Sequence, residues 1–403
     1  MTLGAAMPRE AKYDILFEPV QLGPKTLRNR FWQVPHCNGA GSDRPGFQAA
    51  FRGMKAEGGW GAVFTEVCTI SPGGDVMPWV ASKLWDDGDV RNLAQMTEAI
   101  HAHDALAGVE LCHPGGLAAN AETRAPASVV SQIASDINYL ANGRQLSRRE
   151  IAALRREHVK GFKRARAAGF DLLTLYAGLG TFPIYFLYPF YNKRTDEYGG
   201  AFENRIRFTR EVLEDIRGEI DDVAIGVRFV MDTLEDPYGY GDLGVRAGEE
   251  GTQFIAALDH LVDYWDLNIG TLNWGEDAGS SRFFESNHEA PYTRVAKQVT
   301  AKPCVNVGRF TDPTSCWRPS GPASATSSAP PGPRSPTRSC RRRSRKAGSK
   351  TSASASAATC ACPAGRWAAP RSGAPRTPPA ARNTAAAGIR NDSAPPATRT
   401  SRC

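Results

Sequence analysis

The last 89 residues, Ser315 to Cys403, contain no Leu, Val, Phe, Tyr or Met, and their large apolar residues are Trp317, Trp367 and Ile389. A segment of this composition cannot bury enough apolar surface to offset roughly 1–2 kcal/mol of backbone entropy per ordered residue. We therefore expect residues 314–403 to be a low-complexity, basic and disordered tail, and residues 1–313 to be the folded domain.

Acidic residues are also nearly absent from that segment. It holds 16 Lys and Arg against one acid, Asp392, whereas the rest of the chain holds 33 Lys and Arg against 41 Asp and Glu. The formal charge of +7 for the whole chain therefore hides a body with a net charge of −8. A mildly acidic body argues against a nucleic-acid partner, which the basic average would otherwise suggest.

The sequence also lacks long apolar runs. No stretch approaches about 18 consecutive apolar residues, and the N-terminus has no signal-peptide pattern. We therefore expect a cytoplasmic protein that does not bind a membrane. In that compartment the widely spaced cysteines of the body should be free thiols rather than a disulfide framework: Cys37, Cys68, Cys112 and Cys304.

Short apolar runs rich in β-branched residues alternate with longer amphipathic runs in the body. The expected strands are Arg30–Val34, Gly61–Val67, Leu106–Cys112, Asp171–Tyr176, Ala224–Val230, Trp265–Gly270 and Pro303–Gly308. Helical patterns lie between them over residues 89–103, 147–169 and 203–220, and Ser147 with Glu150 predicts a capping box. This alternation predicts an α/β fold with parallel strands, either a doubly wound sheet or an eight-fold β/α (TIM) barrel.

The positions of chemically useful residues favour the barrel. Such residues follow or end five different strands: Cys37, Tyr176, Arg228, Trp274 with Asp277, and Gly308 with Arg309. Chemistry contributed from the carboxyl ends of many strands is typical of a TIM barrel. A doubly wound fold would concentrate it at one point, and no G-x-G-x-x-G follows the first strand.

Three strings carry a family resemblance: "ILFEPVQLGPKTLRNRFWQVPHCNGAGSD", "YNKRTDEYGGAFENRIRF" and "VNVGRFTDP". With them, residues 13–313 resemble the Old Yellow Enzyme family of FMN flavoproteins, in particular its trimethylamine, dimethylamine and histamine dehydrogenase branch. The resemblance implies a barrel with FMN in its mouth, a small-molecule substrate and, in intact members, an electron-acceptor protein and a homodimer. The "NKRTDEYGG" loop is expected to be structural.

The resemblance implies cofactor-binding roles for Pro35, Cys37, Glu110, Arg228, Gly308 and Arg309. Cys37 falls where that branch bonds FMN covalently, which needs a thiolate beside the ring edge; outside its motif it would be taken as a buried free cysteine. Arg228 would stabilise the reduced flavin, and in any fold an Arg in an apolar strand must be paired. Glu110 would hydrogen-bond the flavin, or else be a capped or solvated carboxylate. The Gly308 turn would hold the phosphate.

The substrate side departs from the branch pattern. Amine dehydrogenases place a Tyr-His-Asp group beside the flavin; Tyr176 and Asp277 match two members, but Leu179 stands where the His is expected. Because general acid-base help is worth roughly 10²–10⁴ in rate, this change weakens the expectation of amine oxidation. Trp274 matches an aromatic wall for a cationic amine, or is a core aromatic, and Val67 stands where a Tyr wall is expected.

The tail is rich in Ser, Ala, Pro, Thr and Arg, whose codons are rich in G and C. In the family this region carries the eighth strand and a C-x₂-C-x₂-C-x₁₂-C cluster motif. Read one nucleotide out of frame, the tail's codons are compatible with both, with cysteines over Ala355, Ala358, Ala361 and Ala374. We therefore hypothesise a frameshift after about residue 313. The alternative is a genuine basic tail that binds nucleic acid or an acidic partner, which "SCRRRSRK" favours.

Several expectations follow for the chain as written. The first and seventh strands would have unpaired edges, because the eighth strand is missing. No metal site is expected, since Cys360 and Cys362 cannot supply the four thiolates of a 4Fe-4S cluster. The expected function is that of an FMN-dependent oxidoreductase resembling amine dehydrogenases. The alternatives are an NAD(P)H-dependent reductase of enones or dienoyl thioesters, and an inactive fragment.

Overall fold

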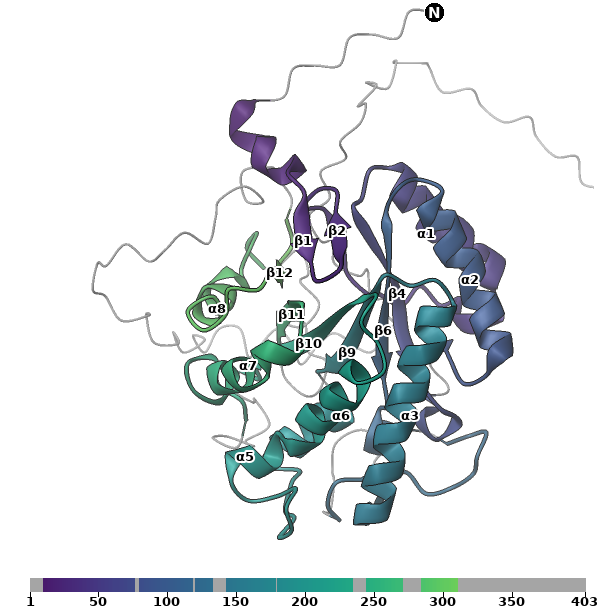
Figure 1. The fold of residues 1–403 in the computed structure, drawn as a ribbon. Coiled ribbons are helices and arrows are strands. Elements are labelled where there is room, and N and C mark those ends of the chain that lie inside the picture. The colour runs from purple at the N-terminus through teal and green to yellow at the C-terminus, as the bar shows by residue number, and fades with distance from the viewer. Residues whose placement is uncertain are drawn as a thin grey trace, which may run out of the picture. The chain divides into compact units, whose positions relative to one another are not determined.

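The fold is built on parallel strands, in a computed structural model that describes residues 10–76, 80–118, 120–132, 143–178, 180–234, 244–270 and 284–310. Seven strands occupy the seven expected regions (Figure 1). They are β3 (Trp32–Gln33), β4 (Ala62–Thr69), β6 (Leu106–Cys112), β9 (Leu172–Ala177), β10 (Ala224–Asp232), β11 (Tyr264–Ile269) and β12 (Cys304–Asn306). A short strand, β5 (Ser82–Lys83), pairs with β4.

These strands form a barrel with one open seam. Each pairs in parallel with its neighbours in the order β3, β4, β6, β9, β10, β11 and β12. No pairing joins β12 to β3 within the described ranges. The predicted β/α barrel is therefore confirmed. The region in which the eighth strand is expected to be missing lies outside the described part of the chain. The proposed domain boundary and the tail also lie outside it.

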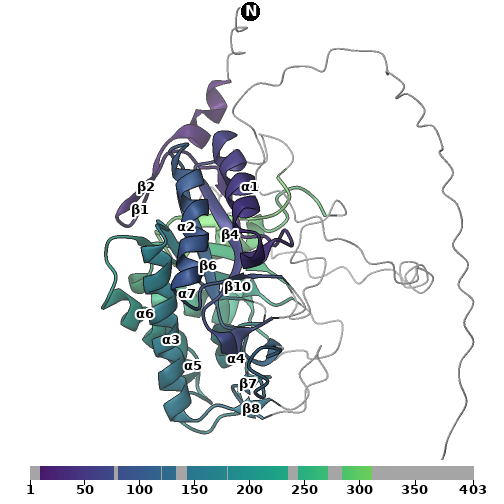
Figure 2. The ribbon, with the colours of Figure 1, turned by 90° about the vertical axis from the view of Figure 1, so that its right-hand side faces the viewer.

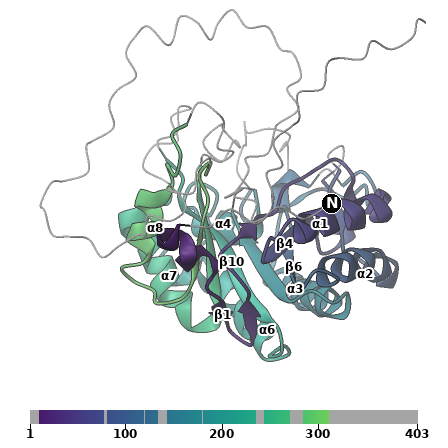
Figure 3. The ribbon, with the colours of Figure 1, turned by 90° about the horizontal axis from the view of Figure 1, so that it is seen from above.

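Helices cover the outer face of the sheet (Figures 2 and 3). They are α1 (Pro45–Glu57), α2 (Asp87–His101), α3 (Arg148–Ala167), α6 (Arg207–Arg217), α7 (Thr252–Leu258) and α8 (Ala290–Ala296). Two short helices, α4 (Phe182–Leu187) and α5 (Phe202–Arg205), lie in the connection between β9 and α6. The capping box before α3 is confirmed, since Ser147 Oγ accepts from the Glu150 N–H and the Glu150 carboxylate accepts from the Ser147 N–H. No helix of the described residues combines the length and apolarity that a membrane span requires.

The helix expected over residues 203–220 is split at Ile206 into α5 and α6. The break coincides with the buried Arg205, whose guanidinium donates to the Leu187 carbonyl and pairs with Glu250. Both partners lie outside the helix, so Arg205 ties the α5 turn to α4 and to the segment before α7.

Aromatic rings fill the interior of the barrel. Trp32 stacks on Phe64 with ring centroids 4.9 Å apart and meets Tyr264 at 5.2 Å. Two glycines make room for these rings: an added Cβ would lie 2.3 Å from Phe64 at Gly108 and 2.2 Å from Tyr264 at Gly226. The hairpin of β1 (Val20–Leu22) and β2 (Lys25–Leu27) adds leucines to the same cluster. This packed interior leaves the carboxyl ends of the strands for chemistry.

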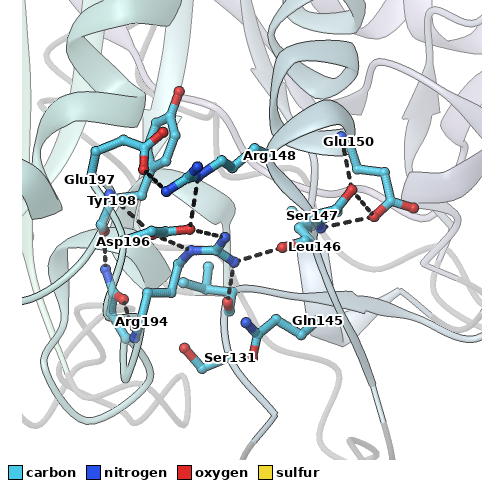
Figure 4. Close-up of polar contacts among 12 residues, drawn as sticks. Ser131, Gln145, Leu146, Ser147, Arg148, Glu150, Arg194, Asp196, Glu197 and Tyr198 are labelled. Carbon is cyan, nitrogen blue, oxygen red and sulfur yellow. Dashed lines mark hydrogen bonds and ion pairs between the residues drawn. The ribbon is translucent and has the colours of Figure 1, made fainter.

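A buried arginine holds the "NKRTDEYGG" loop. The Arg194 guanidinium pairs with Asp196 at 2.6 Å and donates to the carbonyls of Val130 at 2.9 Å and Leu146 at 2.7 Å (Figure 4). Arg148, at the start of α3, also reaches Asp196. Since a buried arginine is stable only with such partners, these contacts support the structural role expected for the loop.

Candidate active site

The strand register places three polar residues in one row across neighbouring strands. The sequence predicted two of them as site residues, and the third was not predicted. Arg228 on β10 lies opposite Tyr176 on β9 and Asp266 on β11. The Arg228 guanidinium carbon lies 5.8 Å from the centre of the buried Tyr176 ring. Neighbouring residues of parallel strands point to the same face of the sheet, so the three side chains form one cluster.

Arg228 lies between two carboxylates. Its Nη1 is 3.4 Å from Glu110 Oε2 and 3.7 Å from Asp266 Oδ2, and the Asp266 side chain is completely buried. Burial raises the pKa of Glu110 to about 7 and that of Asp266 to about 6, although Arg228 lowers both. Burial also acts to lower the pKa of Arg228, but the two carboxylates outweigh it and raise that pKa. The guanidinium therefore stays charged, as the sequence required of an Arg in an apolar strand.

Several polar atoms of this cluster have no hydrogen-bond partner among the residues that the structure describes. They are Arg228 Nε, Glu110 Oε2, both Asp266 carboxylate oxygens and Asn268 Oδ1. Unsatisfied buried polar groups cost free energy, so their concentration in one place marks a site that can accept a polar ligand. Sequence reasoning missed Asp266 and Asn268; the available signal was two polar residues within the otherwise apolar strand "YWDLNI".

Cys37 lies in the loop after β3 and is exposed, whereas Pro35 is buried. Nearby protein atoms still exclude enough water, together with the charge of Glu66, to raise the pKa of the Cys37 thiol to about 11. At neutral pH the thiol is therefore protonated in the chain alone. The cysteines in the described part of the chain are all free, as expected.

The turn after β12 approaches a second segment of backbone. Gly308 has φ +136°, and a Cβ there would lie 3.2 Å from the backbone nitrogens of His288 and Glu289. Arg309 follows with φ 54° and donates from Nη1 to the Phe284 carbonyl at 2.7 Å. A side chain at position 308 would fill the space beside these nitrogens.

The substrate-side residues are only partly placed. Val67 on β4 lies opposite Glu110 on β6, beside the charged cluster. Burial, with the charge of Glu110, raises the pKa of Tyr176, which keeps its phenol neutral. Leu179, Trp274 and Asp277 lie outside the described residues. No group of His, Cys, Asp and Glu in the described ranges has a metal-binding arrangement.

A family model for the NADH:flavin oxidoreductase / NADH oxidase family matches residues 15–317. The chain belongs to this family. Membership confirms the flavin-oxidoreductase resemblance and agrees with the barrel of parallel strands.

Relatives within the family include amine dehydrogenases. Dimethylamine dehydrogenase of Hyphomicrobium sp. (strain x) is 45% identical over 315 residues, covering 76% of this chain and 42% of that protein. The structure of histamine dehydrogenase from Rhizobium sp. 4-9 aligns with a TM-score of 0.71 and 41% identity, over 76% of this chain and 44% of that one. NADPH dehydrogenase of Bacillus subtilis (strain 168) is 28% identical over 265 residues, or 63% of this chain and 76% of that protein. The chain thus spans less than half the length of the amine dehydrogenases it matches.

Proposed function

We propose that this chain is the FMN-binding barrel of an oxidoreductase that takes a hydride equivalent from a small amine. The observation that carries the proposal is the buried Arg228, held charged between Glu110 and Asp266, with an Nε that has no hydrogen-bond partner within the described ranges. Membership of the flavin family and the 45% identity to a dimethylamine dehydrogenase also support the proposal.

The residues present fit FMN. Among the described residues, Arg228 Nε and Glu110 Oε2 have no hydrogen-bond partner, although Glu110 Oε2 lies 3.4 Å from Arg228 Nη1 in an ion pair, and a flavin pyrimidine offers both donors and acceptors for them. Pro35 and Cys37 would lie at the ring edge, and Gly308 with Arg309 at the phosphate. FMN, when bound, supplies the acceptor of the hydride equivalent.

Arg228 would stabilise negative charge that develops on the cofactor. Its own charge is secured by Asp266 and Glu110, and in a buried site a fixed cation acts more strongly than it would in water. Glu110, with a pKa of about 7, can donate as well as accept a hydrogen bond at neutral pH. The two carboxylates also limit how much negative charge the cluster can accept.

On the substrate side, Tyr176 would act as a neutral hydrogen-bond donor rather than as a base, because burial raises its pKa. We propose that Tyr176 and Asp277 take part in catalysis and that Val67, Leu179 and Trp274 shape the substrate site. A face of Trp274 suits a cationic amine. An acceptor protein would take up the electrons.

Cys37 would attach covalently to the flavin ring edge. Its Sγ would hold the cofactor in place by that bond, with the thiolate as the reacting form of the side chain. The pKa of the Cys37 thiol is about 11, so the thiolate fraction grows as the pH rises. Attachment of Cys37 to the flavin should therefore be faster at higher pH.

A second candidate is a reductase fed by NAD(P)H. Leu179 replaces the histidine of the amine-oxidising group, and the chain covers 76% of a Bacillus subtilis NADPH dehydrogenase. Leu179 cannot give the general acid-base help that the expected histidine would give. A substrate whose reaction does not need this help is therefore favoured over an amine.

The test is anaerobic reduction of the FMN-loaded chain. The purified chain is mixed with FMN, freed of unbound cofactor by gel filtration, and treated with dimethylamine or with NADPH. Loss of the oxidised-flavin absorbance with dimethylamine supports amine oxidation. Loss with NADPH alone supports the reductase, and a chain that retains no flavin is an inactive fragment.

A further inference from the structure

Three buried polar side chains surround the loop that carries Cys37. Glu66 comes from β4, whereas Gln48 and Arg52 come from α1. Their exposed fractions are 0% for Glu66 and Arg52 and 2% for Gln48. Such groups are costly to bury unless each has partners, so their contacts identify what they hold in place.

Glu66 holds the residue after Cys37. Its carboxylate accepts from the backbone N–H of Asn38 at 3.2 Å, from Gln48 Nε2 at 2.7 Å and from Ser82 Oγ at 3.1 Å. Gln48 Oε1 in turn accepts from the Asn38 side chain at 3.0 Å. Both the backbone and the side chain of Asn38 are therefore fixed to β4 and α1.

Arg52 holds the residue before Cys37. Its Nη2 donates to the His36 carbonyl at 2.8 Å, and its Nη1 donates to Gln33 Oε1 at 3.2 Å. The backbone of Cys37 is thus fixed on both sides, while Cys37 itself remains exposed. The backbone on either side of the thiol is therefore held by buried side chains of β4 and α1.

We propose that Glu66 and Arg52 are positioning residues for Cys37, which fix its loop and set the reactivity of its thiol with opposite signs. The proposal rests on the role assigned to Cys37 under the proposed function. Among the described residues, the charged and titratable groups that act on the thiol are Glu66 from β4, Glu110 and Cys112 from β6, and Arg52 from α1. Burial is the main cause that raises the pKa of Cys37, Glu66 raises this pKa further, and Arg52 lowers it.

The test follows alkylation of Cys37 in the full chain by iodoacetamide between pH 7 and 10, with the Cys37 peptide quantified by mass spectrometry. Glu66→Gln keeps an acceptor for the Asn38 N–H but removes the charge. At a pH well below the thiol pKa, lowering that pKa by one unit gives about ten times more thiolate. The lower nucleophilicity of this thiolate offsets part of the gain in rate. Alkylation at pH 8 is therefore expected to rise about three- to tenfold.

Arg52→Met is expected to act in the opposite direction and slow alkylation of Cys37, because it removes the cation that favours the thiolate. Arg52→Lys keeps the charge and should return the rate to within about twofold of the unsubstituted chain. If the two residues only kept the loop folded, both Glu66→Gln and Arg52→Met would loosen it and speed alkylation. That result, or no change in either variant, would overturn the proposal.

Asp171→Asn is the matched control. Asp171 is a largely buried acid that accepts from the Ala107 N–H and His101 at the opposite end of the barrel. Its loss should lower thermal stability without changing the pH profile of Cys37. If Arg52→Met fails to fold, the pH profile of Glu66→Gln decides. A lowered apparent pKa of Cys37 alkylation supports the proposal, whereas an equal rise in rate at every pH between 7 and 10, as a loosened loop would give, overturns it. The measurement needs no flavin, so its failure is distinct from a failure of the chain to bind FMN.

Discussion

At the scale of single residues, one buried cation faces two buried acids. Arg228 Nη1 lies 3.4 Å from Glu110 and 3.7 Å from Asp266, and burial raises the pKa values of these acids to about 7 and about 6. Both values exceed those of the unfolded chain, so the folded state binds these protons more tightly. The stability that this tighter proton binding contributes is fully present below about pH 4, and it is lost as the pH rises through about 6 to 7.

Glu110→Gln should remove part of this pH dependence. At pH 8 the variant lacks a buried negative charge, so its free energy of unfolding should exceed that of the unsubstituted chain by on the order of 1 kcal/mol. At pH 5 the difference should largely disappear. Urea unfolding at both pH values measures this, with the exposed Glu122→Gln as control. An equal effect at both pH values would contradict the assigned protonation.

The sequence predicted the need for partners at Arg228 but not their identity. Glu110 was singled out through the family motif, whereas Asp266 was not, because a single sequence does not give the register between β10 and β11. The same limit hid Glu66 and Arg52. Their role depends on contacts between a strand, a helix and a loop, which no local pattern records.

At the scale of elements, glycines on the strands leave space for interior rings. Gly226→Ala would place a Cβ 2.2 Å from the Tyr264 ring, so we expect the free energy of unfolding to fall by about 1–3 kcal/mol. Gly46→Ala in α1 is the control, because nothing lies within 4 Å of its added Cβ, and it should be neutral or slightly stabilising. Thermal melts compare the two. Equal stability of both variants would mean that the barrel interior is loosely packed.

All seven strands were predicted from periodicity, because buried parallel strands give short apolar runs. The end points were less predictable: β3 is only Trp32–Gln33, and the helix expected over residues 203–220 is divided at Ile206. Arg205, beside this division, pairs with Glu250, a contact between distant parts of the chain that no local pattern gives. Loop residues such as Asp277 stay predictions, since they lie outside the described residues.

At the scale of the whole molecule, the barrel has an open seam. Within the described residues, β3 and β12 are not paired with each other, and α1, which follows β3, exposes 51% of Phe47 and 59% of Met54. Unpaired edges and exposed apolar side chains favour association between copies. We therefore predict that the chain self-associates as its concentration rises.

Sedimentation velocity at increasing protein concentration measures this association, and the double variant Phe47→Gln, Met54→Gln should reduce it. A monomer at every concentration would show that the seam is covered in solution. The proposed frameshift is tested separately by reading the gene's nucleotides for the four expected cysteine codons.

The central claim is that the Arg228 cluster of this chain binds FMN, and FMN titration followed by flavin fluorescence tests it most directly. We predict that residues 1–403 bind one FMN per chain, with the affinity weakened at least about tenfold by Arg228→Met and unchanged by Arg44→Met, an exposed arginine. Circular dichroism confirms that each variant is folded. A folded chain that does not bind FMN, or an Arg228→Met variant that binds it equally well, would contradict the account.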